Sequence, residues 1–157
     1  MATSVLHADM LQFVTFRIDG RRYAADILKV QEINNIKEIT PVPNAPDYVE
    51  GAVNLRGKVI PVLNLRKKFH FEPLPLNEQT KIIVISIKGV TMGLIVDAVS
   101  DVLRVPADVV EPPPPVATGA KSDFIRGIAK LADGLVIVLD VDRLLDDGEA
   151  VSVSRAA

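Results

Sequence analysis

The 157-residue chain contains two copies of one apolar pattern, and this repeat limits the possible folds more than any other feature. Phe13–Val30 aligns with Ile82–Val99, which we call the upstream alignment, and Tyr48–Phe69 aligns without a gap with Phe124–Leu145, which we call the downstream alignment. Self-similarity at a fixed offset indicates a tandem duplication. The offset is larger in the downstream alignment, so the second copy contains an insertion between residues 102 and 124. Each copy is marginal alone, so the copies are expected to share an interface.

Each copy contains about five short apolar segments separated by turn residues. Val, Ile and Leu dominate them, which favours strands. The predicted strands are Leu11–Ile18, Arg22–Ile27, two within Tyr48–Phe69, Lys81–Ile87, Thr91–Val96, Ile125–Ala129 and Leu135–Val141. After the second strand of copy one, Ile27, Val30 and Ile33 recur every third residue, which fits either a helical turn or a bent strand. The sequence predicts an all-β fold with minor helix, made of two tandem five-stranded β-barrels packed together.

The predicted domain spans residues 11–145. Its barrel subdomains are placed at about 11–71 and 81–145, with a linker at 72–80, and an exchange of N- or C-terminal strands between the barrels is left open. Residues 1–10 and 149–157 are expected to be flexible tails. The connector Arg104–Asp123 carries the run Pro112–Pro115, which is typical of a stiff polyproline II spacer.

Composition narrows the function classes. The chain has no cysteine and only two histidines, His7 and His70, so no disulfide framework, histidine-rich metal site or cofactor is expected, and the pattern fits a reducing cytoplasm. No segment resembles a signal peptide or a membrane span. A formal net charge of −2 gives no general attraction to nucleic acid or acidic lipid.

No nucleophile–base pair or phosphate-binding loop is present. The best carboxylate cluster is Asp140 with Asp142, which could hold Mg²⁺ or act in phosphotransfer. A solvated surface is favoured instead, because Asp142 aligns with Arg66 in the other copy. The cations at residues 66–68 are interpreted as a solvated helix face rather than a nucleic-acid contact.

The best recognition candidate is Arg56, at a predicted hairpin turn. The second copy has Ala132 at this place within the same apolar pattern, so the barrel does not require an arginine there. Val30 and Val99, like Ile33 and Val102, are matched between the copies, and they serve either as core residues or as the lining of a groove between the barrels. An apolar groove with an arginine at its rim has the anatomy of a protein-recognition site.

Four segments resemble the CheW family of bacterial chemotaxis coupling proteins. They are Asp26–Ile33, Tyr48–Gly57 with its Asn-Leu-Arg-Gly signature, Val59–Leu65 and Gly93–Leu103. The resemblance covers about Leu11 to Leu145. It implies two SH3-like barrels and a non-catalytic adaptor that couples the cytoplasmic tips of chemoreceptors to the histidine kinase CheA. The adaptor would be cytoplasmic and recruited to membrane-associated receptor arrays.

The resemblance also assigns sites. The implied receptor-facing residues are Val30, Gly51, Asn54, Arg56, Val99 and Val102, and Glu32 is expected to orient Arg56. The kinase regulatory domain would dock barrel against barrel, through residues that the sequence does not assign. The proline run from Pro112 and the short polar tail depart from the family pattern. Three alternatives stay open: a CheW-like adaptor of a pilus or gene-regulatory pathway, a Mg²⁺-dependent enzyme using Asp140 and Asp142, and a nucleic-acid-binding barrel supported by fold alone.

Overall fold

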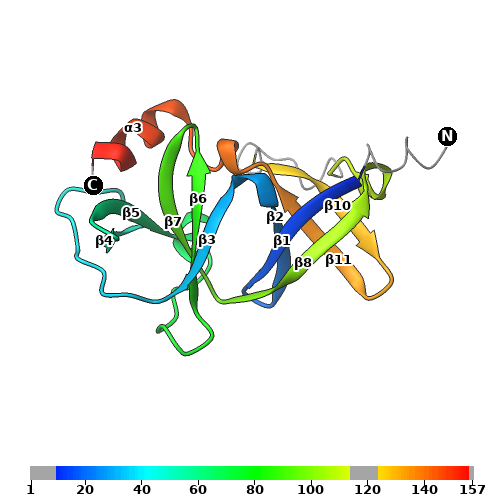
Figure 1. Cartoon of the computed structure of the whole chain (residues 1–157), viewed down its shortest axis with the longest axis horizontal. Coiled ribbons are helices and arrows are strands. Elements are labelled where there is room, and N and C mark those ends of the chain that lie inside the picture. The colour runs from blue at the N-terminus through cyan, green and yellow to red at the C-terminus, as the bar shows by residue number, and fades with distance from the viewer. Residues whose placement is uncertain (1–9, 114–123, 156–157) are drawn as a thin grey trace.

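The computed structural model describes residues 10–113 and 124–155, which form two β-sheets that lie side by side (Figure 1). The first sheet has the strand order β8-β1-β2-β11-β10-β9, and the second has the order β3-β6-β7-β5-β4. The first sheet consists of β1 (Met10–Ile18), β2 (Arg21–Asp26), β8 (Ala98–Pro106), β9 (Val110–Glu111), β10 (Ile125–Leu131) and β11 (Gly134–Leu139). The second consists of β3 (Val30–Asn35), β4 (Val49–Leu55), β5 (Lys58–Asn64), β6 (Lys81–Ile87) and β7 (Val90–Val96). The helical elements are η1 (Ile27–Lys29), α2 (Leu65–Lys68), η2 (Ala107–Val109), η5 (Val141–Arg143) and α3 (Asp147–Arg155).

The predicted fold class is confirmed: the chain is all-β with minor helix and forms two packed barrels. Each sheet has its own small apolar core, and the first sheet gains a sixth strand, the short β9. The hairpins β1–β2 and β6–β7 are related by the upstream alignment, and β4–β5 and β10–β11 by the downstream alignment. The duplication seen in the sequence is therefore a duplication of strands.

The barrels, however, are not the two sequence copies. Hairpin β1–β2 of copy one pairs with β8 and β11 of copy two, and hairpin β6–β7 of copy two pairs with β3 and β5 of copy one. The two exchanges are equivalent, because the parallel pairs Ala24↔Val138 and Gly93↔Val62 coincide under the two alignments. The first barrel thus combines residues 10–26 with 98–111 and 125–139, while the strands of the second all lie between residues 30 and 96. The exchange of strands that the sequence analysis left open is therefore present, and the first barrel takes strands from both sides of the boundary expected at 72–80. Periodicity locates strands without saying which copy they pair with.

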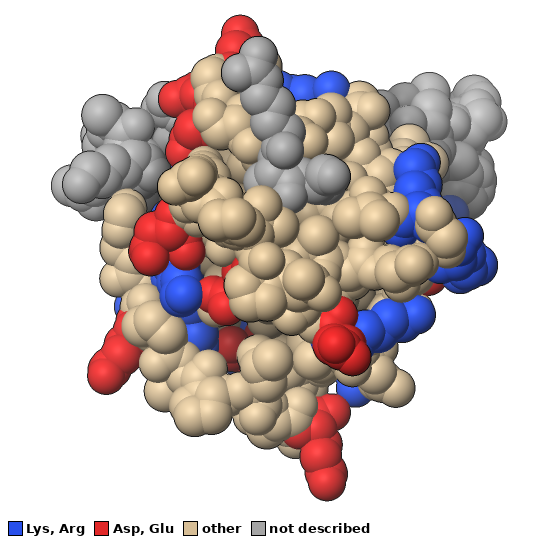
Figure 2. Space-filling view, turned by 90° about the vertical axis from the view of Figure 1, so that its left-hand side faces the viewer, with Lys and Arg blue, Asp and Glu red and all other residues tan. Residues whose placement is uncertain are grey.

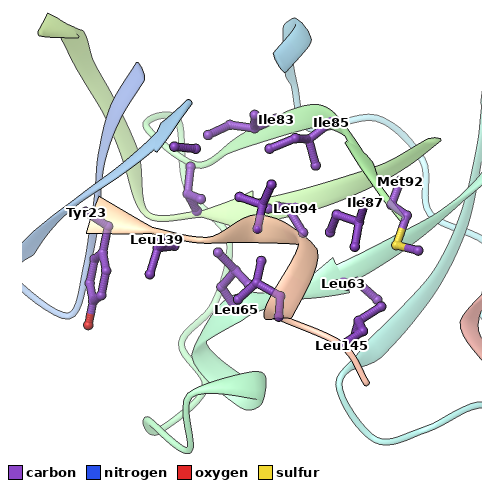
Figure 3. Packing of buried hydrophobic residues seen from close by; sticks show 14 of the residues in the cluster. Tyr23, Leu63, Leu65, Ile83, Ile85, Ile87, Met92, Leu94, Leu139 and Leu145 are labelled. Atoms are coloured by element: carbon purple, nitrogen blue, oxygen red, sulfur yellow. The ribbon is translucent and has the colours of Figure 1, made fainter. Parts of the chain in front are cut away.

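The largest apolar core lies between the barrels (Figure 3). It contains nineteen buried residues, against seven and six for the cores inside the second and first barrels. Strand alternation explains the division: Ile83 and Ile85 face the core between the barrels, while Ile82 faces the interior of its own barrel. Because most of the buried apolar surface is shared, neither barrel is expected to be stable alone.

Two charged contacts join the barrels beside this core. They are related by the duplication, but the residue that is a cation in one contact is an anion in the other. In one, the Arg66 guanidinium donates from Nε and Nη2 to Asp97 at 2.9 and 2.7 Å and approaches Asp19 of the β1–β2 turn at 3.4 Å. In the other, Asp142, which aligns with Arg66, accepts from the backbone N–H of Lys88 in the β6–β7 turn at 2.8 Å. Lys29 also donates to Asp142, at 2.9 Å. The prediction of a solvated face at residues 66–68 is wrong for Arg66, whose side chain is only 10% exposed.

Residues 149–155, expected to belong to a flexible tail, are part of helix α3. Asp146 and Glu149 exchange hydrogen bonds at the start of α3, as in a capping box. Ala150 and Val153 are buried in the core between the barrels, and Glu149 accepts a hydrogen bond from Lys68 at 2.7 Å. Two apolar residues are too few to predict an amphipathic helix from the sequence. They stabilise the helix only because they pack against a core formed by other parts of the chain. Neither this helix nor any other described one is long and apolar enough to cross a membrane.

Candidate functional site

Strands β3 and β8 carry the matched apolar residues predicted from the repeat. They are edge strands of the two sheets, and in Figure 1 they leave the junction between the barrels in opposite directions. Each has one extra residue relative to its partner strand, because the register shifts between Val30 and Glu32 in β3 and opposite Val14 and Phe16 in β8. Such a bulge places residues three apart on the same side of a strand. The three-residue spacing in the sequence is therefore a bulged strand that follows the short turn η1.

The four matched residues differ in how deeply they are buried. Val30 and Val99 are partly buried and pack against that core. Ile33 is 40% exposed and Val102 57% exposed. We refer to these four residues as the β3–β8 face. Of the positions predicted to contact a receptor, Val30 lies on β3 and Val99 and Val102 lie on β8, and Ile33 is the β3 counterpart of Val102.

Arg56 lies at the tip of the β4–β5 hairpin. Arg56 and Gly57 both have positive φ, 52° and 83°, as in the turns that suit two-residue hairpins. The Asn54 side chain accepts a hydrogen bond from the Gly57 backbone N–H at 2.8 Å, which closes the turn. The Arg56 side chain is 74% exposed. The turn therefore holds the backbone in place and directs the guanidinium toward solvent.

Glu32 joins this arginine to the β3–β8 face. Arg56 donates to both carboxylate oxygens of Glu32, with an Nη1 to Oε1 distance of 3.3 Å, and Asn34 donates to Oε1 at 2.8 Å. The hydrogen bonds from Arg56 and then Asn34 lower the pKa of Glu32, and the hydrogen bond with Glu32 raises the pKa of Arg56. An exposed ion pair contributes little to stability. Its main effect is to restrict where the guanidinium can point.

Gly51 differs from the other predicted positions, because it is buried and leaves no room for a side chain. A Cβ atom there would lie 2.1 Å from the Thr40 carbonyl oxygen. Its counterpart Gly127 meets the same restriction, since a Cβ atom there would lie 2.5 Å from the Glu111 carbonyl oxygen. A glycine that both copies need for close backbone approach has a structural role, whatever contact its backbone also makes.

The carboxylates considered for metal binding are engaged elsewhere. Asp142 forms the contact between the barrels described above, and Asp140 lies 3.5 Å from Arg143. Within residues 10–113 and 124–155, no three Asp, Glu, His or Cys side chains converge as a metal site would require. The described residues therefore offer the Mg²⁺ hypothesis no coordination sphere.

Two further surfaces bear on ligand binding. A cavity of about 690 Å³ is lined by aromatic residues such as Phe69 and Phe124 and by charged ones such as Lys68 and Glu149, and none of its lining residues belongs to the β3–β8 face. The amine of Lys68 at its edge is already paired with Glu149. Figure 2 shows the end of the molecule formed by the second barrel, where most Lys and Arg side chains lie along the right-hand side and most Asp and Glu side chains lie at the left and at the bottom.

Several known proteins are similar to this chain in sequence, and a solved structure is similar to it in fold. Residues 12–149 match the family model described as CheW-like domain. A Chemotaxis protein CheW of Klebsiella aerogenes is 34% identical over 146 residues, which are 93% of this chain and 88% of that protein. Protein PilI of Pseudomonas aeruginosa is 30% identical over 115 residues, 73% of this chain and 65% of that protein. The crystal structure of the scaffolding protein TtCheW from Thermoanaerobacter tengcongensis is similar with a TM-score of 0.81 at 37% identity, covering 88% of this chain and 94% of that chain.

Proposed function

The chain belongs to the CheW-like domain family, and from this premise we propose that it couples the signalling tips of chemoreceptors to the histidine kinase CheA. Relatives named for chemotaxis and a structural neighbour described as a scaffolding protein support a chemotaxis adaptor. Such a protein works by holding partners in a fixed geometry, without a chemical step. In the cell it would be recruited to receptor arrays at the membrane.

The β3–β8 face with Arg56 beside it is the observation that carries the proposal. Val30 and Val99 pack against the core between the barrels, and the exposed guanidinium of Arg56 donates to Glu32, which restricts its position. A partly apolar helical tip could bury Ile33 and Val102 and present an acceptor to Arg56. Apolar contact area would supply affinity, while one positioned guanidinium would supply register.

The kinase would bind elsewhere, at the ends of the barrels. Because the barrels are related by duplication, their ends can make related contacts with the similar barrels of a kinase regulatory domain. Two separate surfaces on one rigid body allow a change in the orientation of the receptor tip to be transmitted to the kinase as a change in geometry.

The test is a titration of the chain with a receptor signalling-tip fragment and, separately, with the CheA regulatory domain. Arg56→Glu should weaken receptor binding at least about tenfold and leave kinase binding unchanged. Lys58→Glu is the matched control, since it reverses the same charge within the same turn. Equal losses in both variants would show general electrostatics rather than a positioned guanidinium, and unchanged receptor affinity in Arg56→Glu would contradict the assignment.

A second pathway remains a candidate because one relative is named Protein PilI rather than a chemotaxis protein. The same surfaces would then serve the receptor and kinase of a pathway that controls pili or gene expression. Titration against receptor tips from both kinds of pathway would separate them, because the adaptor should bind its own receptor more tightly.

A further inference from the structure

Leu28 is the most exposed large apolar side chain among the described residues, at 89% exposure. It lies in the turn η1, just before Val30 of the β3–β8 face. Single exposed leucines are common and often have no role. Leu28 differs from them in two respects: hydrogen bonds fix the turn that carries it, and the aligned residue of the other copy is an aspartate.

The turn that presents Leu28 is fixed on both sides. The Asp26 side chain accepts a hydrogen bond from the Leu28 backbone N–H at 2.9 Å, and the Val30 backbone N–H donates to the Ile27 carbonyl oxygen. Lys29 is paired with Asp142 across the barrels at 2.9 Å. Because this backbone is already ordered, a partner that covers Leu28 restricts only the rotamers of its side chain and does not have to order the turn.

The duplication shows that the fold does not require leucine here. The upstream alignment places Leu28 on Asp97, which accepts two of the hydrogen bonds that the Arg66 side chain donates. In the first copy, Leu28 makes no such contact, and the equivalent contact between the barrels is made by the next residue, Lys29, which donates to Asp142. One copy therefore uses this position to join the barrels, and the other leaves an apolar side chain exposed to solvent.

We propose that Leu28 is an additional receptor contact, which extends the β3–β8 face at the end where β3 begins and buries against an apolar side chain of the helical tip. This inference rests on the proposed function. Position favours the receptor over the kinase, because η1 leads directly into β3 and Val30. Asp26 and Lys29 flank the leucine with polar groups, as a rim surrounds an interface hot spot.

The experiment measures binding of a receptor signalling-tip fragment and of the CheA regulatory domain to wild type, Leu28→Ala and Leu135→Ala. Leu135 is the matched control, a leucine 58% exposed on the distant β10–β11 hairpin. We expect Leu28→Ala to raise the Kd for the receptor fragment about tenfold, which corresponds to about 1.4 kcal/mol, with kinase binding unchanged. Leu135→Ala should leave the receptor Kd unchanged. Thermal unfolding should be the same in all three proteins, because neither leucine is buried.

The outcomes separate this inference from the proposed function. Wild type that binds neither partner would overturn both. Wild type that binds the receptor fragment, with Leu28→Ala binding equally well, would overturn the role of Leu28 alone. A loss of kinase binding in Leu28→Ala with the receptor Kd unchanged would also overturn it, by placing the residue in the other interface.

Discussion

Removing the Arg66 side chain tests how the two barrels are held together. Arg66 donates to Asp97 at 2.9 and 2.7 Å and to the Glu72 carbonyl oxygen at 2.8 Å, and its side chain is 10% exposed. Breaking a buried ion pair by removing one partner costs about 3 to 5 kcal/mol. The Asp97 side chain is 32% exposed, so water can solvate the carboxylate that remains. We therefore expect Arg66→Ala to lower the free energy of unfolding by about 2 to 3 kcal/mol.

Urea unfolding followed by circular dichroism would measure this change, together with thermal unfolding. At about 2 to 4 °C per kcal/mol for a domain of this size, Tm should fall by roughly 5 to 10 °C. Arg66→Asp should cost more than Arg66→Ala, because it places a carboxylate against Asp97, even though the other copy carries an acid at this place. Arg143→Ala is the control: its pair with Asp140 is exposed and should contribute close to nothing.

A double-mutant cycle with Asp97→Ala isolates the pair itself. The two single losses should exceed the loss in the double variant by about 1 kcal/mol or more. Additive losses, or a cost of less than about 0.5 kcal/mol for Arg66→Ala, would refute the conclusion that this contact stabilises the packing of the barrels.

Two further predictions concern the site and the second contact between the barrels. Gly51→Ala should lower the free energy of unfolding, measured in urea, by about 3 kcal/mol, because the added Cβ would overlap the Thr40 carbonyl oxygen. Gly20→Ala is the control: Gly20 has a positive φ but open space around it, so the loss should be about 1 kcal/mol. Equal losses in the two variants would contradict the steric argument. The hydrogen bond from the Lys88 backbone N–H, and after it the one from the Lys29 side chain, lowers the pKa of Asp142. The ionised Asp142 carboxylate therefore stabilises the fold above the ordinary carboxyl pKa of about 3.9, and this contribution is lost as the pH falls through the lowered pKa of the folded protein. Asp142→Asn should therefore be less stable than wild type by about 1 kcal/mol at pH 7, and the difference should shrink below about pH 4; a difference that is constant with pH would contradict this linkage.

The repeat predicted the strands and the fold class, but it could not predict which copy each hairpin pairs with. Both hairpins have the same alternation of apolar and polar residues, so they would fit either barrel equally well by periodicity. The choice is made by contacts far apart in sequence, such as Arg66 with Asp97 and Asp142 with Lys29. The reversed polarity of these two contacts favours the observed docking, because exchanging the partners would oppose like charges.

The same dependence on contacts far apart in sequence explains two wrong local predictions, the solvated face at Arg66 and the flexible C-terminal tail. In the local sequence, Arg66 looks like a solvated cation. Its partners, Asp19 in the β1–β2 turn and Asp97 between β7 and β8, lie near it only in the folded chain. Helix α3 has only Ala150 and Val153 to mark its buried face, and that face has meaning only against the core between the barrels. Both features depend on tertiary structure that the local sequence does not encode.

Candidate recognition residues were easier to find, because the second copy serves as an internal reference. Arg56 stands out against Ala132 within an otherwise repeated hairpin. Comparing Leu28 with Asp97 could have identified a second candidate in the same way, but only the structure shows that the leucine is exposed and its turn fixed. Gly51 shows the opposite case, since its counterpart Gly127 is also a glycine and both fill a steric requirement.

The most direct test of the adaptor function is whether one chain holds both partners at once. Sedimentation velocity of the labelled chain with saturating receptor signalling-tip fragment and CheA regulatory domain would show this. Separate surfaces predict a ternary species whose mass is the sum of all three components, and adding the second partner should not release the first. Competition between the two partners for the chain would contradict the account, because a protein with one shared surface cannot couple a receptor to a kinase.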